Sequence, residues 1–141
     1  MKKLNRKGFT LIELLAVIVV LAIVLVVTIP SVISSMENAR KEEFKNVVVT
    51  VEKYMEKQID ACNLDDTTLA PYEDSIFTVD TCQIDINKAS TIVAKAGYKL
   101  SSTDGTAEFA SITITTAGKV TSATAGADSK FSGATYSNSA S

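Results

Sequence analysis

The residues with the clearest chemical potential lie within the first thirteen positions of the chain. Glu13 is the single charge in an apolar run that extends from Phe9 to Ile29. An isolated carboxylate in a membrane helix costs roughly 2.5–3.5 kcal/mol on insertion scales, so it persists only where a partner offsets that cost. Hydrolysis of the bond between Gly8 and Phe9 would create such a partner. The new amino group would lie four residues from Glu13.

Cys62 and Cys82 are the two cysteines of the chain, and they form no Cys-x-x-Cys motif, so a redox site is not expected. A basic leader followed by an apolar run predicts that both lie outside the cytoplasm, where disulfides persist. We therefore predict one Cys62–Cys82 bridge, which would stabilise the fold by about 3 kcal/mol in the chain-entropy model. Two free thiols are the alternative.

Residues for catalysis and metal binding are scarce. The chain has no His and no Trp, and it contains no Gly-rich phosphate loop. Ser and Thr are abundant, yet no motif places a base beside them, so we predict no catalytic residue and no enzyme. Asp65-Asp66 and Glu73-Asp74 suggest calcium by composition, but their spacing matches no strong loop motif. We expect a solvated polar loop there, with no metal and no cofactor.

The charge balance does not favour nucleic acid as a partner. The chain carries 14 basic and 16 acidic side chains, a formal net charge of −2. Loss of residues 1–8 would remove four basic side chains and leave ten against sixteen, or −6. Nucleic-acid binding normally requires basic patches, so a DNA-capturing surface is not expected.

A long apolar segment must position the N-terminal residues. Phe9 to Ile29 is 21 residues, or about 31 Å as a helix, enough to cross a bilayer core of about 30 Å. A conventional signal peptide has its small-residue cleavage site after the apolar core, whereas Gly8 precedes the core here. Cleavage after Gly8 would leave the core on the mature protein. The basic residues Lys2, Lys3, Arg6 and Lys7 favour a cytoplasmic leader.

The stretch Lys7-Gly8-Phe9-Thr10-Leu11-Ile12-Glu13 closely resembles the prepilin processing motif of type IV pilins and pseudopilins. The resemblance extends from Met1 to about Met55. It implies that Gly8 is the last leader residue and that Phe9 becomes a methylated N-terminus. It also implies that Glu13 pairs with the Phe9 amine of a neighbouring subunit in a filament. The alternative is an ordinary single-pass anchor with an incidental Glu.

Pro30 ends the apolar run. A proline inside a helix removes one backbone hydrogen bond and bends the axis, so we predict a kink there. The resemblance implies a second possibility, in which the helix unwinds just before Pro30. The β-branched residues Val24 and 26–29 are weak helix formers and keep unwinding open, whereas Ala22 stands where many pilins have glycine and makes it less certain. Both possibilities stay open.

From Ser31 onwards the pattern is that of an amphipathic helix. Apolar residues recur at spacings of three and four on one stripe: Ile33, Met36, Phe44, Val47, Val48, Val51, Met55 and Ile59. This stripe needs a sheet or loops to cover it. The mixed charges between the apolar positions predict a solvated face, and the alternative is that some of them pair between subunits.

Residues 61–141 are rich in Ser and Thr and too polar to form a strong core alone. Thr106–Thr116 alternates with Ala110, Ile112 and Ile114 on one side, which predicts a strand, a turn at Ala117-Gly118 and a returning strand over 119–124. We also expect a strand at Tyr98–Ser102 and a short helix from Asn87 to Ala96, capped by Asn87 and ended by Gly97. The tail after Gly126 is either an ordered loop anchored by Phe131 and Tyr136 or partly mobile.

The predicted fold is α+β, with a long N-terminal α-helix packed on a small antiparallel sheet of three or four strands. We expect four parts: the leader (1–8), the membrane or filament-core helix (9–30), the amphipathic stem helix (31–60) and a small globular head (61–141). The resemblance implies a structural pilus subunit that polymerises with its own kind for adhesion, motility or attachment. Its expected partners are the prepilin peptidase, the membrane before assembly, and an assembly platform with its ATPase.

The expected location is the plasma or inner membrane as a single-pass protein, and then the extracellular filament. The alternative is a pseudopilin of a type II secretion or DNA-uptake system, or a minor pilin.

Overall fold

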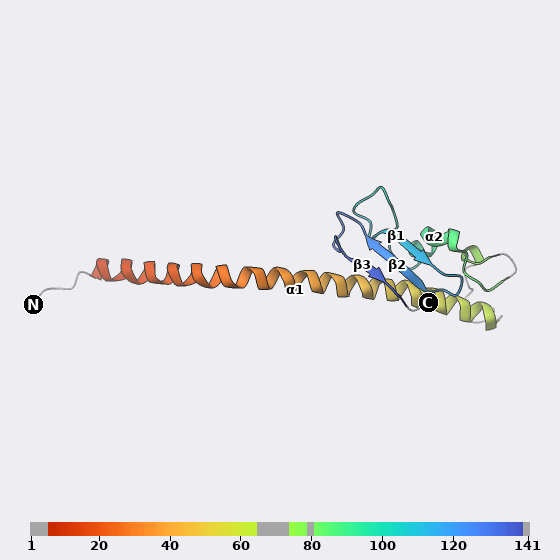
Figure 1. The fold of residues 1–141 in the computed structure, drawn as a ribbon, viewed down its shortest axis with the longest axis horizontal. Helices are drawn as coiled ribbons and strands as arrows, with labels where there is room; N and C mark the ends of the chain where they lie inside the picture. The colour runs from red at the N-terminus through yellow and green to blue at the C-terminus, as the bar shows by residue number, and fades with distance from the viewer. Residues whose placement is uncertain (1–5, 65–73, 79–80, 140–141) are drawn as a thin grey trace, which may run out of the picture. The chain divides into compact units, whose positions relative to one another are not determined.

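The computed structural model describes residues 6–64, 74–78 and 81–139 of the chain. In chain order its elements are α1 (Arg6–Leu64), η1 (Asp74–Ile76), η2 (Ile86–Lys88), α2 (Ala89–Lys95), β1 (Phe109–Ile114), β2 (Val120–Ala125) and β3 (Thr135–Ser137) (Figure 1). The chain divides after Asn38 into two compact units. The predicted α+β fold is confirmed, and the antiparallel sheet has three strands.

The first unit is the N-terminal part of α1. From Leu11 to Met36 its large apolar side chains are all exposed, from 49% at Val19 to 72% at Val26. The helix continues through Pro30 without interruption. A bend or a local unwinding at Pro30 therefore stays a prediction.

The second unit, residues 39–141, builds one hydrophobic core on the C-terminal part of α1. Phe44, Val48, Val51 and Met55 recur at helical spacing and are fully buried, which confirms the predicted stripe over this range. Ile33 and Met36 were expected on the same stripe, but they are 53% and 52% exposed. The core begins only at Phe44, so the stripe extends beyond what the monomer covers.

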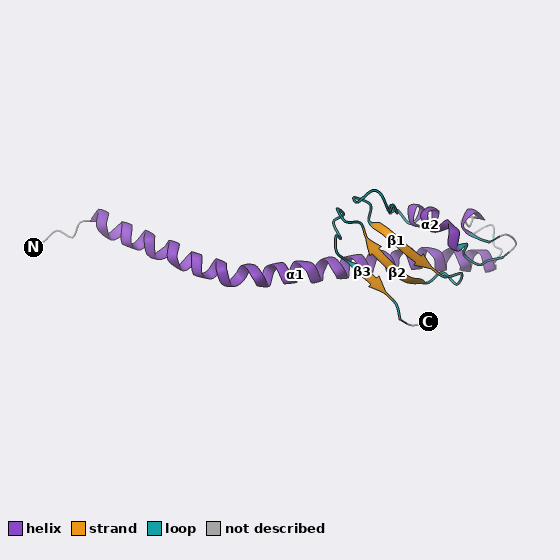
Figure 2. Ribbon diagram, turned by 45° about the horizontal axis from the view of Figure 1, so that its top comes forward, coloured by secondary structure: helices purple, strands orange, loops and turns teal. Residues whose placement is uncertain are grey.

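The sheet has the order β1-β2-β3 and lies beside the C-terminal part of α1 (Figure 2). The predicted turn at Ala117-Gly118 joins β1 to β2. Gly118 has φ +75°, and a Cβ there would lie 2.8 Å from the Cδ1 of Ile59 on α1. Glycine therefore satisfies both the backbone conformation and the close approach of this turn to the helix.

The predicted alternation in β1 is confirmed with one addition. Ile114 is buried and Ala110 and Ile112 are partly buried, while the residues between them are exposed. Phe109 is also fully buried although it directly precedes Ala110. A register shift between Phe109 and Ser111 allows both neighbours to face the core. The Phe109 ring packs 5.4 Å from the Phe44 ring, centroid to centroid.

The prediction of a strand at Tyr98–Ser102 was wrong. This segment forms only an isolated parallel bridge between Leu100 and Phe109. Its Ser101 N–H donates to the Phe109 carbonyl at 3.0 Å, and the Phe109 N–H donates to the Lys99 carbonyl at 3.0 Å. The segment thus borders β1 without extending the sheet.

The short helix predicted at 87–96 is present as η2 followed by α2, but its cap differs. Asp85 caps the start, because its carboxylate accepts from the Asn87 backbone N–H at 2.9 Å. Gly97 ends the helix as predicted, with φ +94°. The Tyr98 N–H then donates to the Val93 carbonyl at 3.0 Å, as in a Schellman motif.

The tail after Gly126 supplies the third strand of the sheet. Phe131 is fully buried, with its ring 5.7 Å from that of Phe44, so its predicted anchoring role is confirmed. Tyr136 lies in β3, opposite Ala123, and is partly buried.

The predicted disulfide joins Cys62, near the end of α1, to Cys82, with their Cα atoms 5.7 Å apart. It closes the connection between α1 and the segment that leads to η2. Asp65, Asp66 and Glu73, and the side chain of Asp74, lie outside the described residues, so the expectation of a solvated loop there stays a prediction. Among the residues that are described, no three His, Cys, Asp or Glu side chains form a metal-binding group.

Candidate processing and assembly site

The predicted cleavage point lies in the first turn of α1. The helix begins at Arg6, so the Gly8–Phe9 peptide bond and Glu13 belong to one continuous helical segment. The side chain of Phe9 lies outside the described part, whereas Glu13 is exposed. Positions 9 and 13 are four apart on a helix and therefore share one face. The backbone thus places the Phe9 nitrogen and the only acidic side chain of the apolar run at the same end of α1.

An apolar surface on all sides of α1 surrounds this acidic group. Leu11 and Ile12 before Glu13 are 67% and 71% exposed, and Leu14 after it is 58% exposed. Burying apolar surface is worth about 25 cal/mol per Å², so a helix with this surface requires a lipid or protein environment. By length and composition, α1 is able to cross a membrane.

The exposed apolar surface does not stop at Pro30. Val32, Ile33 and Met36 are 54%, 53% and 52% exposed, although the membrane-length run ends at Ile29. Ile33 and Met36 belong to the predicted stripe, which the core leaves uncovered here, and Val32 directly precedes Ile33. They extend the surface available to a partner by two further helical turns.

Comparison with known families decides what this N-terminal segment is. Residues 3–29 match the family model of the prokaryotic N-terminal methylation motif. The segment carries the class III prepilin leader motif of type IV pilins and pseudopilins. The match includes Gly8, Phe9 and Glu13 and ends at Ile29. No curated protein and no solved structure matches the chain significantly.

The class III leader indicates how a helix of this kind is processed and used. Leaders of this class imply processing by a prepilin peptidase and incorporation into a pilus-type assembly, and they indicate a structural rather than an enzymatic protein. An exposed apolar helix fits a membrane-anchored pilin-like subunit that later enters a filament.

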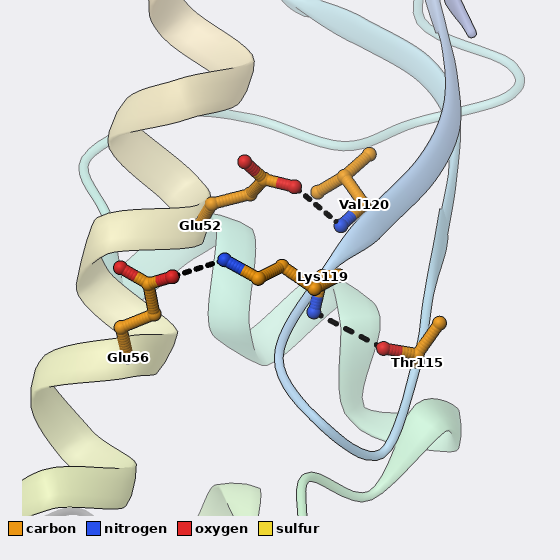
Figure 3. A network of polar contacts seen from close by, with 5 residues as sticks. All are labelled: Glu52, Glu56, Thr115, Lys119 and Val120. Carbon is orange, nitrogen blue, oxygen red and sulfur yellow. Dashed lines mark hydrogen bonds and ion pairs between the residues drawn. The ribbon is translucent and has the colours of Figure 1, made fainter. Parts of the chain in front are cut away.

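A second group of functional side chains, not foreseen from the sequence, attaches the sheet to α1 (Figure 3). The β1–β2 ladder shifts register between Thr113 and Ile114, opposite Val120. The Val120 N–H donates to Glu52 Oε1 at 2.8 Å. Glu52 thereby satisfies a backbone group of the sheet from the helix side.

Glu56, one helical turn further on, pairs with the ammonium group of Lys119. The hydrogen bond that the ammonium group donates to Glu56 raises the pKa of Lys119, with smaller contributions from the charges of Glu56 and Glu52. The Lys119 N–H also donates to Thr115 Oγ1 at 3.1 Å, which fixes the turn (Figure 3). Two carboxylates four residues apart on the border of an apolar stripe were the sequence signal for this contact.

A third glutamate attaches the tail. Lys130 Nζ lies 3.0 Å from Glu43 Oε1 and 4.6 Å from the centroid of the Phe131 ring. The charged residues predicted to form a solvated face therefore include three that contact the sheet or the tail of the same chain. Both ion pairs are exposed to solvent, so their contribution to stability is small.

Asp104, in the loop before β1, has a carboxyl group whose pKa is lowered. The Thr106 hydroxyl and then the Thr106 backbone N–H donate to Asp104 and lower the pKa of its carboxyl group. The two donor–acceptor distances are 2.6 Å and 3.0 Å. This is an Asx turn that stabilises the loop, and it explains the pKa shift without a ligand.

Proposed function

We propose that this chain is a structural subunit of an extracellular type IV pilus and polymerises through α1. The observation that supports this most is the exposure of the whole apolar N-terminal part of α1, directly after a class III leader. A lipid bilayer covers such a surface before assembly, and the helices of other subunits cover it afterwards. The same helix therefore serves as anchor and as polymerisation element.

Processing and assembly follow from the positions of Gly8, Phe9 and Glu13. A prepilin peptidase in the membrane cleaves after Gly8, and the new Phe9 amine is methylated. An assembly platform driven by its ATPase then moves the subunit from the membrane into the filament. There Glu13 pairs with the Phe9 amine of a neighbour, because a charge in a dry helical core must be paired. This requirement sets the register between subunits.

The proposed division of labour follows the four expected parts. Residues 1–8 are the removable leader, 9–30 form the membrane and core helix, 31–60 form the stem, and 61–141 form the head. Pro30 provides a kink at the end of the apolar run. The head faces the solvent, and its surface determines attachment.

A pseudopilin or a minor pilin is the second candidate, because both use the same leader and the same N-terminal helix. The absence of Trp from the chain favours a pilin over the major secretion pseudopilins, which tend to have Trp-containing C-terminal segments. Abundance in the fibre is the property that separates these candidates.

The test is the intact mass of the protein in fibres sheared from cells. We expect abundant protein that lacks residues 1–8, carries one methyl group and retains the disulfide. Processed protein that stays in the membrane fraction would favour the pseudopilin or minor-pilin candidate. An uncut leader would contradict the processing itself.

A further inference from the structure

The three strands carry a regular array of hydroxyl groups on one face. In the strand register, Ser111 pairs with Thr124 and Thr124 with Thr135, which makes one row across the sheet. A second row consists of Thr113, Ser122 and Ser137, paired in the same way. All six side chains are exposed. We call these six residues the hydroxyl face.

The hydroxyl face has two further properties that bear on what it is able to bind. Among the residues that the structure describes, none of its six hydroxyls hydrogen-bonds to another group of the chain. Elsewhere hydroxyls are often used internally, as in Thr50 to the Asn46 carbonyl at 2.8 Å or Ser132 to the Ala127 carbonyl at 2.6 Å. In addition, β1, β2 and β3 contain no charged residue.

The hydroxyl face is turned away from α1. Successive residues of a strand point to opposite faces, and the buried residues Ile114, Val120 and Ala123 occupy the face that packs on the helix. If α1 lines the filament axis, as the proposed function requires, the opposite face of the sheet is directed outwards. Every subunit then presents the same uncharged array on the filament surface.

Such an array is complementary to itself. Each hydroxyl both donates and accepts a hydrogen bond, so two identical faces related by a twofold axis satisfy one another. A charged patch on the same fold would instead repel its own copy. With a formal charge of −6 after processing, the uncharged face is where two copies approach with the least repulsion.

We propose that the hydroxyl face is a contact between filaments, and that its occupant is the hydroxyl face of a second copy of this chain in a neighbouring filament. This inference depends on the proposed function. Six residues are far fewer than the roughly 20–30 per side of a stable interface, so one pair of faces cannot hold two monomers together. Along two parallel filaments the contact repeats. Once one pair of faces has met, the next pair is held at high effective concentration, so many weak contacts together bind the two filaments strongly.

The experiment compares bundling of sheared filaments that carry opposite charges at Thr124, the centre of one row. The fraction of filaments in the low-speed pellet should be more than about twofold lower for Thr124→Lys and for Thr124→Glu than for wild type, since like charges then face one another. A mixture of the two should pellet again, because the charges become complementary. Ser90→Lys and Ser90→Glu, on the exposed surface of α2, add the same net charges elsewhere and should leave pelleting unchanged.

Salt provides an independent readout. Salt screens the repulsion between the other surfaces, so wild-type bundles should increase as salt is raised. Filaments that stay single at all salt concentrations would overturn the inference while leaving the proposed function intact. Thr124 variants that disperse but do not pellet again when mixed would also overturn it and would point to a bridging polysaccharide. Absence of filaments altogether would overturn the proposed function and this inference with it.

Discussion

At the scale of single residues, Glu13 is the group on which the proposed assembly depends. Between Phe9 and Ile29 it is the one charge in an otherwise apolar stretch of the helix. In a filament core it is stable only beside a positive group, and removal of one partner of a buried pair costs about 3–5 kcal/mol. The carboxylate therefore penalises every register of the helices except the one that supplies an amine.

The first prediction concerns this charge. Glu13→Ala and the uncharged near-isostere Glu13→Gln should both insert and be cleaved, but sheared fibres should fall by about tenfold or more, since the Phe9 amine stays unpaired. Intact mass of membrane and fibre fractions measures both effects. Glu37→Ala, which removes an exposed acid further along α1, should assemble normally. Abundant fibres from Glu13→Gln would exclude the ion pair as the register device.

Glu52 carries the second prediction. It accepts from the Val120 N–H in a partly buried contact, so Glu52→Ala should destabilise the fold by about 1–3 kcal/mol. Chemical denaturation of the full chain in detergent, followed by near-UV circular dichroism, measures the loss. Glu42→Ala is the matched control, because Glu42 is exposed on the same helix, and it should change stability by less than about 0.5 kcal/mol. Equal losses in both variants would mean that the helix charge, and not the bond to Val120, matters.

The third prediction concerns Asp104, whose pKa is lowered by the two donors of Thr106. A lowered folded-state pKa gives stability that is present above the ordinary carboxyl pKa and is lost as the pH falls through the folded value. Asp104→Asn should therefore be less stable than wild type at neutral pH, and the difference should vanish in strong acid. Denaturation midpoints from pH 7 downwards measure this. A constant difference at all pH values would contradict the assignment.

The residue scale also shows what the sequence predicts well. The exported compartment and the presence of exactly one cysteine pair made the Cys62–Cys82 bridge predictable. The donors that Asp85 and Glu52 meet were not predictable, because each is a backbone N–H whose position depends on turns or on a register shift. Local sequence identifies possible acceptors, and the tertiary fold decides which donor reaches them.

At the scale of elements, periodicity was sufficient for α1 and for most of the sheet. The 3.6-residue stripe located the core from Phe44 to Met55, and alternation located β1 and β2. It failed where the ladder is irregular: Phe109 is buried beside Ala110 because of a register shift. It also missed β3, because a segment of three residues is too short to show a pattern of its own and forms a strand only beside β2.

The disulfide gives the fourth prediction, because it constrains the link between α1 and the rest of the fold. Reduction should lower the unfolding free energy of the full chain by about 3 kcal/mol in the chain-entropy model. Thermal unfolding in detergent, with and without reductant, measures the loss. The double variant Cys62→Ser/Cys82→Ser should have the stability of the reduced protein and should not respond to reductant. A wild-type protein unaffected by reduction would contradict a stabilising role.

At the scale of the whole molecule, cleavage changes what the N-terminus is able to join. The uncut chain begins with a leader that has four basic side chains, and its Phe9 nitrogen is an amide without charge. Such a chain remains suited to the membrane, because basic residues beside an apolar helix favour the cytoplasmic side. It is unsuited to a dry filament core, because the leader charges would be buried and Glu13 would have no amine. Under the proposed function, cleavage is therefore the step that commits this membrane protein to polymerisation.

The fifth prediction tests this coupling. Gly8→Lys, with a long charged side chain before the scissile bond, should block cleavage, so only the uncut mass should be found, confined to the membrane fraction, and sheared fibres should be absent. Gly97→Lys adds the same charge at an exposed position of the second unit, and because its φ is +94° it serves as a control for a general folding defect. Its product should still lose residues 1–8, even if its fold is less stable. Fibres built from uncut Gly8→Lys chains would show that neither the Phe9 amine nor removal of the leader is needed, and would refute the pairing with Glu13 as well.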